Sequence, residues 1–137
     1  MTTVVSFETA KALRDAGFSI PEPNHGQFWY IEYTGELEVI TFVGDNGVHR
    51  MYIPFLKGMN SCAKEPFLNG SVFAPTATDI MSELTPICFL MKDSPVNGRI
   101  LWQGQVEAKR GILEYRTEKY DNPHDAAAEL WAYVNNK

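Results

Sequence analysis

The sequence predicts an α+β fold: a single domain covering residues 1–137, with three helices packed on an antiparallel sheet, or on two small sheets, of about six strands. Two patterns predict it. Apolar residues recur at helical spacing near both ends of the chain, and aromatic or β-branched runs separated by glycine-bearing turns lie between them. The length of 137 residues suits one core, and 45% hydrophobic residues is typical of a globular domain.

The first predicted helix begins near Ser6, whose hydroxyl can accept a hydrogen bond from the free amides of the first turn. Phe7, Ala10 and Leu13 follow at three-residue spacing and form one apolar face, which should pack against the rest of the domain. Gly17 can take the left-handed conformation that ends a helix.

A connector and three strands are expected next. Residues 19–26 hold two prolines and a glycine, which neither a helix nor a strand accommodates in its interior. From Phe28 on, short turns separate the aromatic and β-branched runs FWYIEY, LEVITFV and VHRMYIPF. This pattern predicts a meander of three consecutive antiparallel strands.

The segment from Pro54 to Pro75 combines three prolines and two glycines with many apolar side chains. Long loops are uncommon in compact domains and are often functional. Because loops that insert into a partner's pocket carry such apolar anchors in turn-rich backbone, the segment is a candidate interaction surface. Its members are Phe55, Leu56, Met59, Phe67 and Leu68. The alternatives are that these side chains pack beneath their own loop, or that part of the segment is a further strand.

A short second helix, capped by Thr76 or Thr78, should end before Pro86. A second β region follows it. We expect strands at 87–91, 100–106 and 111–115, a turn at 93–98 and a bulge at Gly104.

The last predicted helix has the clearest start signal in the chain. Asn122 can cap it, Pro123 fits its first position, and Asp125 opposes the positive end of the helix dipole. Apolar residues then recur at the spacing of an amphipathic helix. The expected core of the domain is Phe7, Leu13, Trp29, Ile31, Ile40, Phe42, Ile80, Leu84, Phe89, Leu101, Leu130, Trp131 and Val134.

Charge and cysteine content narrow the class of protein. A formal net charge of -5 disfavours general binding to phosphate backbones. The first residues lack the pattern of a cleavable export signal, and no run is apolar for long enough to span a membrane, so we expect a cytoplasmic protein without a membrane partner. Cys62 and Cys88 are not grouped, which favours two reduced thiols over a disulfide.

The sequence predicts no catalytic residue, no cofactor and no metal site. His25, His49 and His124 are isolated, whereas metal sites commonly contain at least one closely spaced pair of ligands. A pair formed by a cysteine and a histidine remains an alternative that only the fold can bring together.

A basic and aromatic stretch supports a further alternative. Lys109, Arg110, Arg116 and Lys119 lie close in sequence to Tyr115 and Tyr120, a combination that can grip single-stranded nucleic acid. Four acidic residues are interleaved with the four basic ones, so the balance favours an exposed hairpin of mixed charge.

The spans VSFETAKALRDAGF, APTATDIMSEL and YDNPHDAAAELWAYV resemble a family of small uncharacterised proteins found in bacteriophages, prophages and their bacterial hosts. The resemblance implies a bacterial or phage cytoplasmic origin and carries no activity or catalytic residue with it. The matched residues are helix caps and helix faces, so we interpret them as determinants of architecture. They are Ser6, Phe7, Ala10, Pro75, Thr76, Asn122, Pro123, Ala127, Leu130 and Trp131.

Three functional hypotheses follow. The first is a non-enzymatic accessory or interaction protein of phage or prophage type, which contacts an unidentified protein partner in the bacterial cytoplasm. The second is a small enzyme or ligand-binding domain with a pocket near Cys62 or Cys88. The third is a weak nucleic-acid binder acting through residues 109–120.

Overall fold

The computed structural model describes residues 3–24, 26–40, 42–45, 49–52, 61–63, 69–84, 87–96, 99–107 and 111–136. Its contacts divide the chain into two compact units. The terminal unit consists of Met1–Thr9 and Pro75–Lys137, and the central unit of Ala10–Ala74. The predicted extent of one domain over residues 1–137 stays a prediction.

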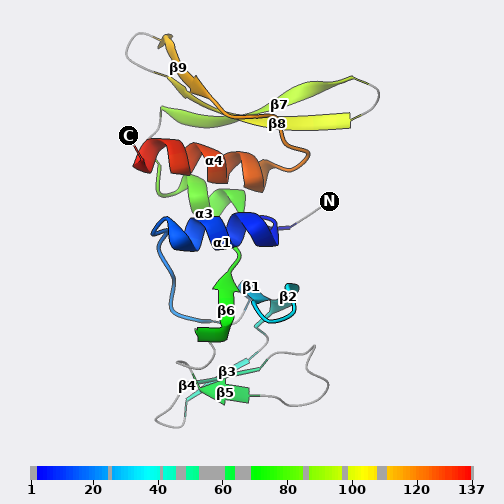
Figure 1. The fold of residues 1–137 in the computed structure, drawn as a ribbon, viewed down its shortest axis with the longest axis vertical. Helices are drawn as coiled ribbons and strands as arrows, with labels where there is room; N and C mark the ends of the chain where they lie inside the picture. Colours follow the sequence, from blue (N-terminus) through cyan, green and yellow to red (C-terminus); the bar gives the residue numbers. More distant parts are fainter. Residues whose placement is uncertain are drawn as a thin grey trace. The chain divides into compact units, whose positions relative to one another are not determined.

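The α+β class is confirmed, and the strand pairs among the described residues are all antiparallel (Figure 1). The elements with described bounds are α1 (Phe7–Asp15), β1 (Phe28–Ile31), β2 (Glu36–Val39), β3 (Phe42–Asp45), β4 (His49–Tyr52), β5 (Ser61–Ala63), β6 (Ser71–Phe73), α3 (Ala77–Met81), β7 (Cys88–Val96), β8 (Arg99–Glu107), β9 (Leu113–Arg116) and α4 (Pro123–Asn135). The strands form sheets in the orders β2-β1-β6, β3-β4-β5 and β7-β8-β9, so they outnumber the six or so expected.

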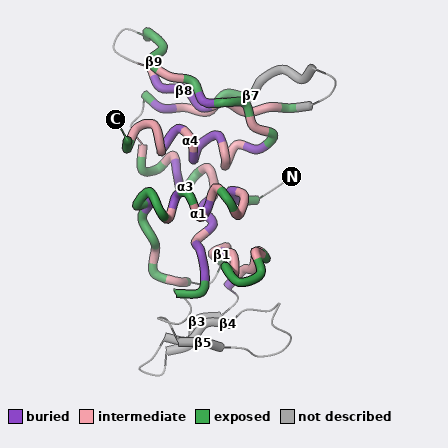
Figure 2. The backbone as a smooth tube through the Cα atoms, viewed as in Figure 1, coloured by how far each residue is buried: buried purple, intermediate pink, exposed green. Residues whose placement is uncertain are grey.

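In the terminal unit, α4 lies along one face of the β7-β8-β9 sheet (Figure 1). Cys88 is paired with Val106 across β7 and β8, and both side chains join Leu130 of α4 in a buried cluster. Buried residues of this unit concentrate in α4 and in the second half of β8 (Figure 2). The predicted amphipathic helix is therefore confirmed, and its apolar face packs on the sheet.

Gly104 allows this close packing. A Cβ at this position would lie 3.1 Å from Cγ2 of Thr117 and 3.2 Å from both the carbonyl oxygen of Ala126 and Cβ of Leu130. The register shifts occur elsewhere, between Asp93 and Val96 and between Val106 and Glu107, so the bulge predicted at Gly104 is wrong. The glycine marks a close approach of helix to strand instead.

Helix starts follow the predicted signals. Thr76 caps α3, accepting a hydrogen bond from the amide of Asp79, whose carboxylate accepts one in return from the amide of Thr76. At the start of α1, the amide of Thr9 donates to Oγ of Ser6 at 3.3 Å. Gly17 has φ of 93°, which confirms the left-handed stop after α1.

In the central unit, β1 lies between β2 and β6. Trp29 of β1 is buried, and its ring lies 5.3 Å from that of Phe73 in β6, centroid to centroid. Leu13 of α1 and Val72 of β6 are also buried. A small sheet and the amphipathic face of α1 thus supply the described core of this unit.

The predicted three-stranded meander is wrong, because the run LEVITFV forms two strands that belong to different sheets. The pairing of β2 with β1 continues to Ile40, whose amide donates to the carbonyl of Gln27 at 3.0 Å. The amide of Gly26, which has φ of 92°, donates to the carbonyl of Ile40 at 2.8 Å. In the second half of the run, β3 pairs with β4 in another sheet.

The predicted turn at 93–98 is also wrong in its first part, since β7 continues to Val96. Pro95 is tolerated within the strand because β7 is an edge strand.

The expected core is confirmed in part. Leu13, Trp29, Ile40, Ile80, Leu130 and Trp131 are buried, whereas Phe7, Ile31, Leu84, Phe89, Leu101 and Val134 are partly exposed. Phe89 is paired with Gln105 and therefore lies on the sheet face opposite Val106 and α4. The side chain of Phe42 lies outside the described residues.

The insert at 54–75 contains two strands, β5 and β6, which confirms the alternative of a further strand. The candidate surface residues Phe55, Leu56, Met59, Phe67 and Leu68 all lie outside the described residues. Among the helices that are described, none combines the length and the apolar character required to cross a membrane.

Candidate functional site

The three spans that carry the family resemblance meet at the first turn of α4, within the terminal unit. The amide of Ser6 donates to Oδ1 of Asp125 at 3.0 Å, and the amide of Ala77 donates to Nδ1 of His124 at 2.8 Å. The amide of Val5 donates to the carbonyl of Pro75 at 3.1 Å. Backbone amides that the starts of α1 and α3 leave without helical partners are thereby satisfied by side chains of α4.

The cap of α4 completes this arrangement. The amide of Asp125 donates to Oδ1 of Asn122 at 2.8 Å, and Nδ2 of Asn122 donates to Oδ2 of Asp125 at 3.1 Å. Each carboxylate oxygen of Asp125 therefore accepts a hydrogen bond from within the chain. These contacts support the interpretation of the matched residues as determinants of architecture.

The structure gives no common site for the three histidines that were considered as metal ligands, among the residues that it describes. The lone pair on Nδ1 of His124 accepts the Ala77 amide, so this nitrogen already has a structural partner. His25 lies outside the described residues, and His49 is described only as a backbone position opposite Asp45 in the β3-β4 pair. Within the described ranges, no three His, Cys, Asp or Glu residues gather as ligands for a metal ion.

Glu129 of α4 organises the aromatic part of the stretch 109–120. Its Oε2 accepts a hydrogen bond from the hydroxyl of Tyr115 at 2.5 Å, and its Oε1 accepts one from the hydroxyl of Tyr120 at 2.7 Å. The amide of Glu118 also donates to Oε1, at 3.1 Å. One carboxylate thus ties β9 and the segment after it to α4.

These contacts raise the pKa of both tyrosines. The hydrogen bond from Tyr115 to Glu129, aided by burial, raises the pKa of Tyr115 to about 12. Burial and the hydrogen bond to Glu129 raise the pKa of Tyr120 above its usual range. Both phenols therefore keep the proton that they donate to Glu129 up to a higher pH than an ordinary tyrosine does.

The same contacts reduce what the stretch can offer to a nucleic acid. The ring of Tyr115 stacks on that of Tyr133, with centroids 3.8 Å apart and planes 8° apart, so one of its faces is covered. Both hydroxyls are engaged within the chain. Lys109 and Arg110 lie outside the described residues, and nucleic-acid binding stays a prediction.

The two cysteines lie in different units. Cys88 begins β7, is only 7% exposed and belongs to the cluster with Val106 and Leu130. Its thiol behaves as a small apolar group in this position. Cys62 lies in β5, where only the backbone is described.

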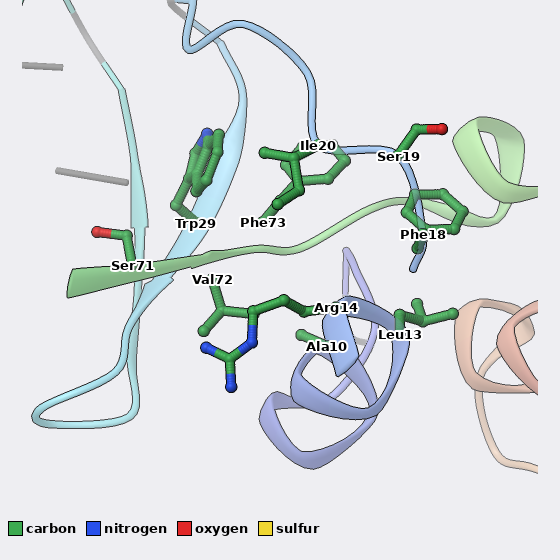
Figure 3. A pocket seen from close by; sticks show the side chains of 10 residues that line it. All are labelled: Ala10, Leu13, Arg14, Phe18, Ser19, Ile20, Trp29, Ser71, Val72 and Phe73. Atoms are coloured by element: carbon green, nitrogen blue, oxygen red, sulfur yellow. The ribbon is translucent and has the colours of Figure 1, made fainter. Parts of the chain in front are cut away.

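The central unit contains a small apolar pocket of about 40 Å³, between α1, β1, β6 and the connector after α1 (Figure 3). Its lining residues are Ala10, Leu13, Arg14, Phe18, Ser19, Ile20, Trp29, Ser71, Val72 and Phe73. Ligand pockets of metabolite size usually measure about 300 to 1,000 Å³. This one has room for only a small chemical group, and neither cysteine lines it.

Exposed aliphatic side chains at one end of the β7-β8-β9 sheet were not predicted as a surface. Ile87 is 50% exposed, Ile112 is 64% exposed and Leu113 is 40% exposed. The backbone places them at the same end of the sheet, because Glu107 of β8 pairs with Leu113 while its amide donates to the carbonyl of Ile87 at 3.0 Å, so that Glu107 lies between them. We call these three residues the apolar sheet end. The sequence predicted strands for Ile87 and for the segment from Gly111 to Tyr115, and it predicted a protein-interaction surface only in the insert at 54–75.

Comparison with known proteins gives no relative: no family model, no curated protein and no solved structure matches the chain. The resemblance to a phage and prophage family therefore stays a prediction.

Proposed function

We propose that the chain is a non-enzymatic accessory protein of the phage or prophage type, which acts by protein–protein contacts in the cytoplasm of a bacterium. The observation that supports this function is the apolar sheet end. Single exposed apolar residues are common, but neighbouring ones on a soluble protein often mark a contact surface. Here three exposed aliphatic residues lie at the same end of one sheet, where the starts of β7 and β9 flank the end of β8.

The chemistry of this surface indicates the kind of contact. Branched aliphatic side chains have no polar group that could orient a substrate, and their gain on binding comes from removing apolar area from water. The partner surface should therefore be apolar as well.

The experiment introduces charge into this surface. The double variant Ile112→Asp/Leu113→Asp should keep its free energy of unfolding within about 0.5 kcal/mol of the parent, because both side chains are exposed. It should lose any partner that the parent retains, measured by quantitative co-purification from the bacterium that carries the gene. Sedimentation of the purified chain reports whether that partner is a second copy.

The control is Ile20→Asp, which places one aspartate at an exposed isoleucine of the central unit. It should retain the partner. If both variants retain the same proteins as the parent, the apolar sheet end is not the contact surface and the proposed function loses its support.

A further inference from the structure

A second surface lies in the central unit, at the turn between β1 and β2. Tyr33 at this turn is 93% exposed and thus has nearly all of its ring in water. Burial of an aromatic side chain removes a large apolar area from water and so contributes to an association, and tyrosine is enriched among the residues that dominate binding energy. Tyr33 keeps this contribution available for a partner.

The turn holds the backbone around Tyr33 in one conformation. The amides of Thr34 and Gly35 both donate to the carbonyl of Ile31, at 3.2 and 2.6 Å, and the amide of Glu36 donates to Oγ1 of Thr34 at 3.2 Å. Gly35 has φ of 75°, which a glycine adopts without strain. Because the backbone is already ordered, a partner that binds here has little loop entropy to remove.

The charges around Tyr33 select the kind of partner. Glu32 and Glu36 flank it and are exposed. The guanidinium of Arg14 lies 3.0 Å from Glu32 and 3.1 Å from Asp15, so one positive charge is shared by two carboxylates. The four groups Arg14, Asp15, Glu32 and Glu36 therefore leave a net negative charge beside the exposed ring.

An aromatic face and carboxylates attract the same chemical groups. Guanidinium and ammonium groups stack over tyrosine rings and pair with carboxylates. We infer that the turn bearing Tyr33, with Glu32 and Glu36, is an interaction surface for a basic protein segment that presents arginine or lysine side chains. This surface rests on different residues from the apolar sheet end, and on the other unit.

The test uses the full chain with a benzophenone amino acid at position 33, irradiated in the bacterium that carries the gene. We expect an adduct whose cross-linked peptide contains arginine or lysine close to the attachment point. The substitution Glu36→Lys should reduce its yield about fivefold, because it replaces an attraction by a repulsion. Ile112→Asp should leave the yield unchanged, which separates this result from the fate of the proposed function.

Two controls make the outcome decisive. Benzophenone at position 20, another exposed apolar site of the same unit, should not give the same adduct. Without benzophenone, Tyr33→Phe should preserve co-purification of the adduct's partner, because it keeps the ring, and Tyr33→Ala should abolish it. The inference is overturned if position 33 yields no adduct of its own, or if its adduct is insensitive to Glu36→Lys or lacks a basic residue.

Discussion

Replacing Gly104 by alanine tests whether the close packing of α4 on the β7-β8-β9 sheet stabilises the terminal unit. The added methyl group would meet Thr117 Cγ2 at 3.1 Å and both Ala126 O and Leu130 Cβ at 3.2 Å. Ordinary van der Waals contact for such a group begins at 3.4 Å, so each contact is 0.2 to 0.3 Å too short.

None of these neighbours moves easily. Leu130 is fully buried, and its Cβ and the carbonyl of Ala126 belong to the frame of α4. The side chain of Thr117 is held by two hydrogen bonds, since its Oγ1 accepts the amide of Gly104 at 2.9 Å and donates to the carbonyl of Glu118 at 2.7 Å. Relief therefore requires the packed backbone of α4 or of β8 to move by a few tenths of an ångström.

The magnitude follows from two opposing effects. Inserting an extra methyl group into a packed core costs about 1 to 3 kcal/mol. Replacing glycine by alanine also restricts the unfolded chain, which stabilises the fold by about 0.4 to 1 kcal/mol. The overpacking is the larger effect at the centre of both ranges, so we expect Gly104→Ala to lower the free energy of unfolding by roughly 1 kcal/mol.

Urea denaturation followed by circular dichroism measures the change. The control is Gly70→Ala, where a Cβ would meet nothing within 4 Å and φ is not in the left-handed region, so this variant should be neutral or slightly more stable. Adding Thr117→Ser to Gly104→Ala removes the methyl group of one contact while keeping the hydroxyl, and should recover part of the loss. A Gly104→Ala variant as stable as the parent, or more stable, would refute the reasoning.

Three further predictions concern other parts of the terminal unit. Folding raises the pKa of Tyr115 to about 12 and also raises that of Tyr120, so the stability that their hydroxyl protons contribute is complete below pH 10 and is lost as the pH rises from about 10 to 12. The double variant Tyr115→Phe/Tyr120→Phe should therefore show a shallower decline of the urea midpoint over that pH range. An unchanged decline would contradict the role of Glu129. Trp131→Ala should lower the free energy of unfolding by about 3 to 5 kcal/mol, because the indole is buried, and a melting temperature within a degree or two of the parent would show that it does not pack. The thiol of Cys88 should react with a disulfide reagent only after urea unfolds the chain, measured on a Cys62→Ser background, and rapid labelling of the native protein would show that it is accessible.

The candidate interaction surfaces show where sequence patterns stop being informative. The apolar residues of the insert predicted an interaction surface at Phe55 and Phe67. The exposed aliphatic residues of the described structure instead include Ile87 and Ile112. The uniformly apolar run ICFLM predicts a buried strand. The sequence does not show which of its residues a helix will cover and which will stay exposed. The exposure of Tyr33 has the same origin, since an aromatic residue near a turn is equally compatible with burial under the sheet.

The sequence determined the local features of this protein. The caps at Ser6, Thr76 and Asn122, the stop at Gly17 and the apolar face of α4 were predictable because each depends on residues within one or two helical turns.

Only the tertiary structure decided which partner each local element meets. The division of the run LEVITFV between two sheets depends on which strands each half pairs with, and the need for glycine at 104 depends on the approach of α4. Asp125 and His124, in the first turn of α4, accept amides at the starts of α1 and α3, which are more than a hundred and nearly fifty residues away in the sequence. Hydrogen bonds and packing across such separations depend on distances in space, which spacing along the chain does not encode.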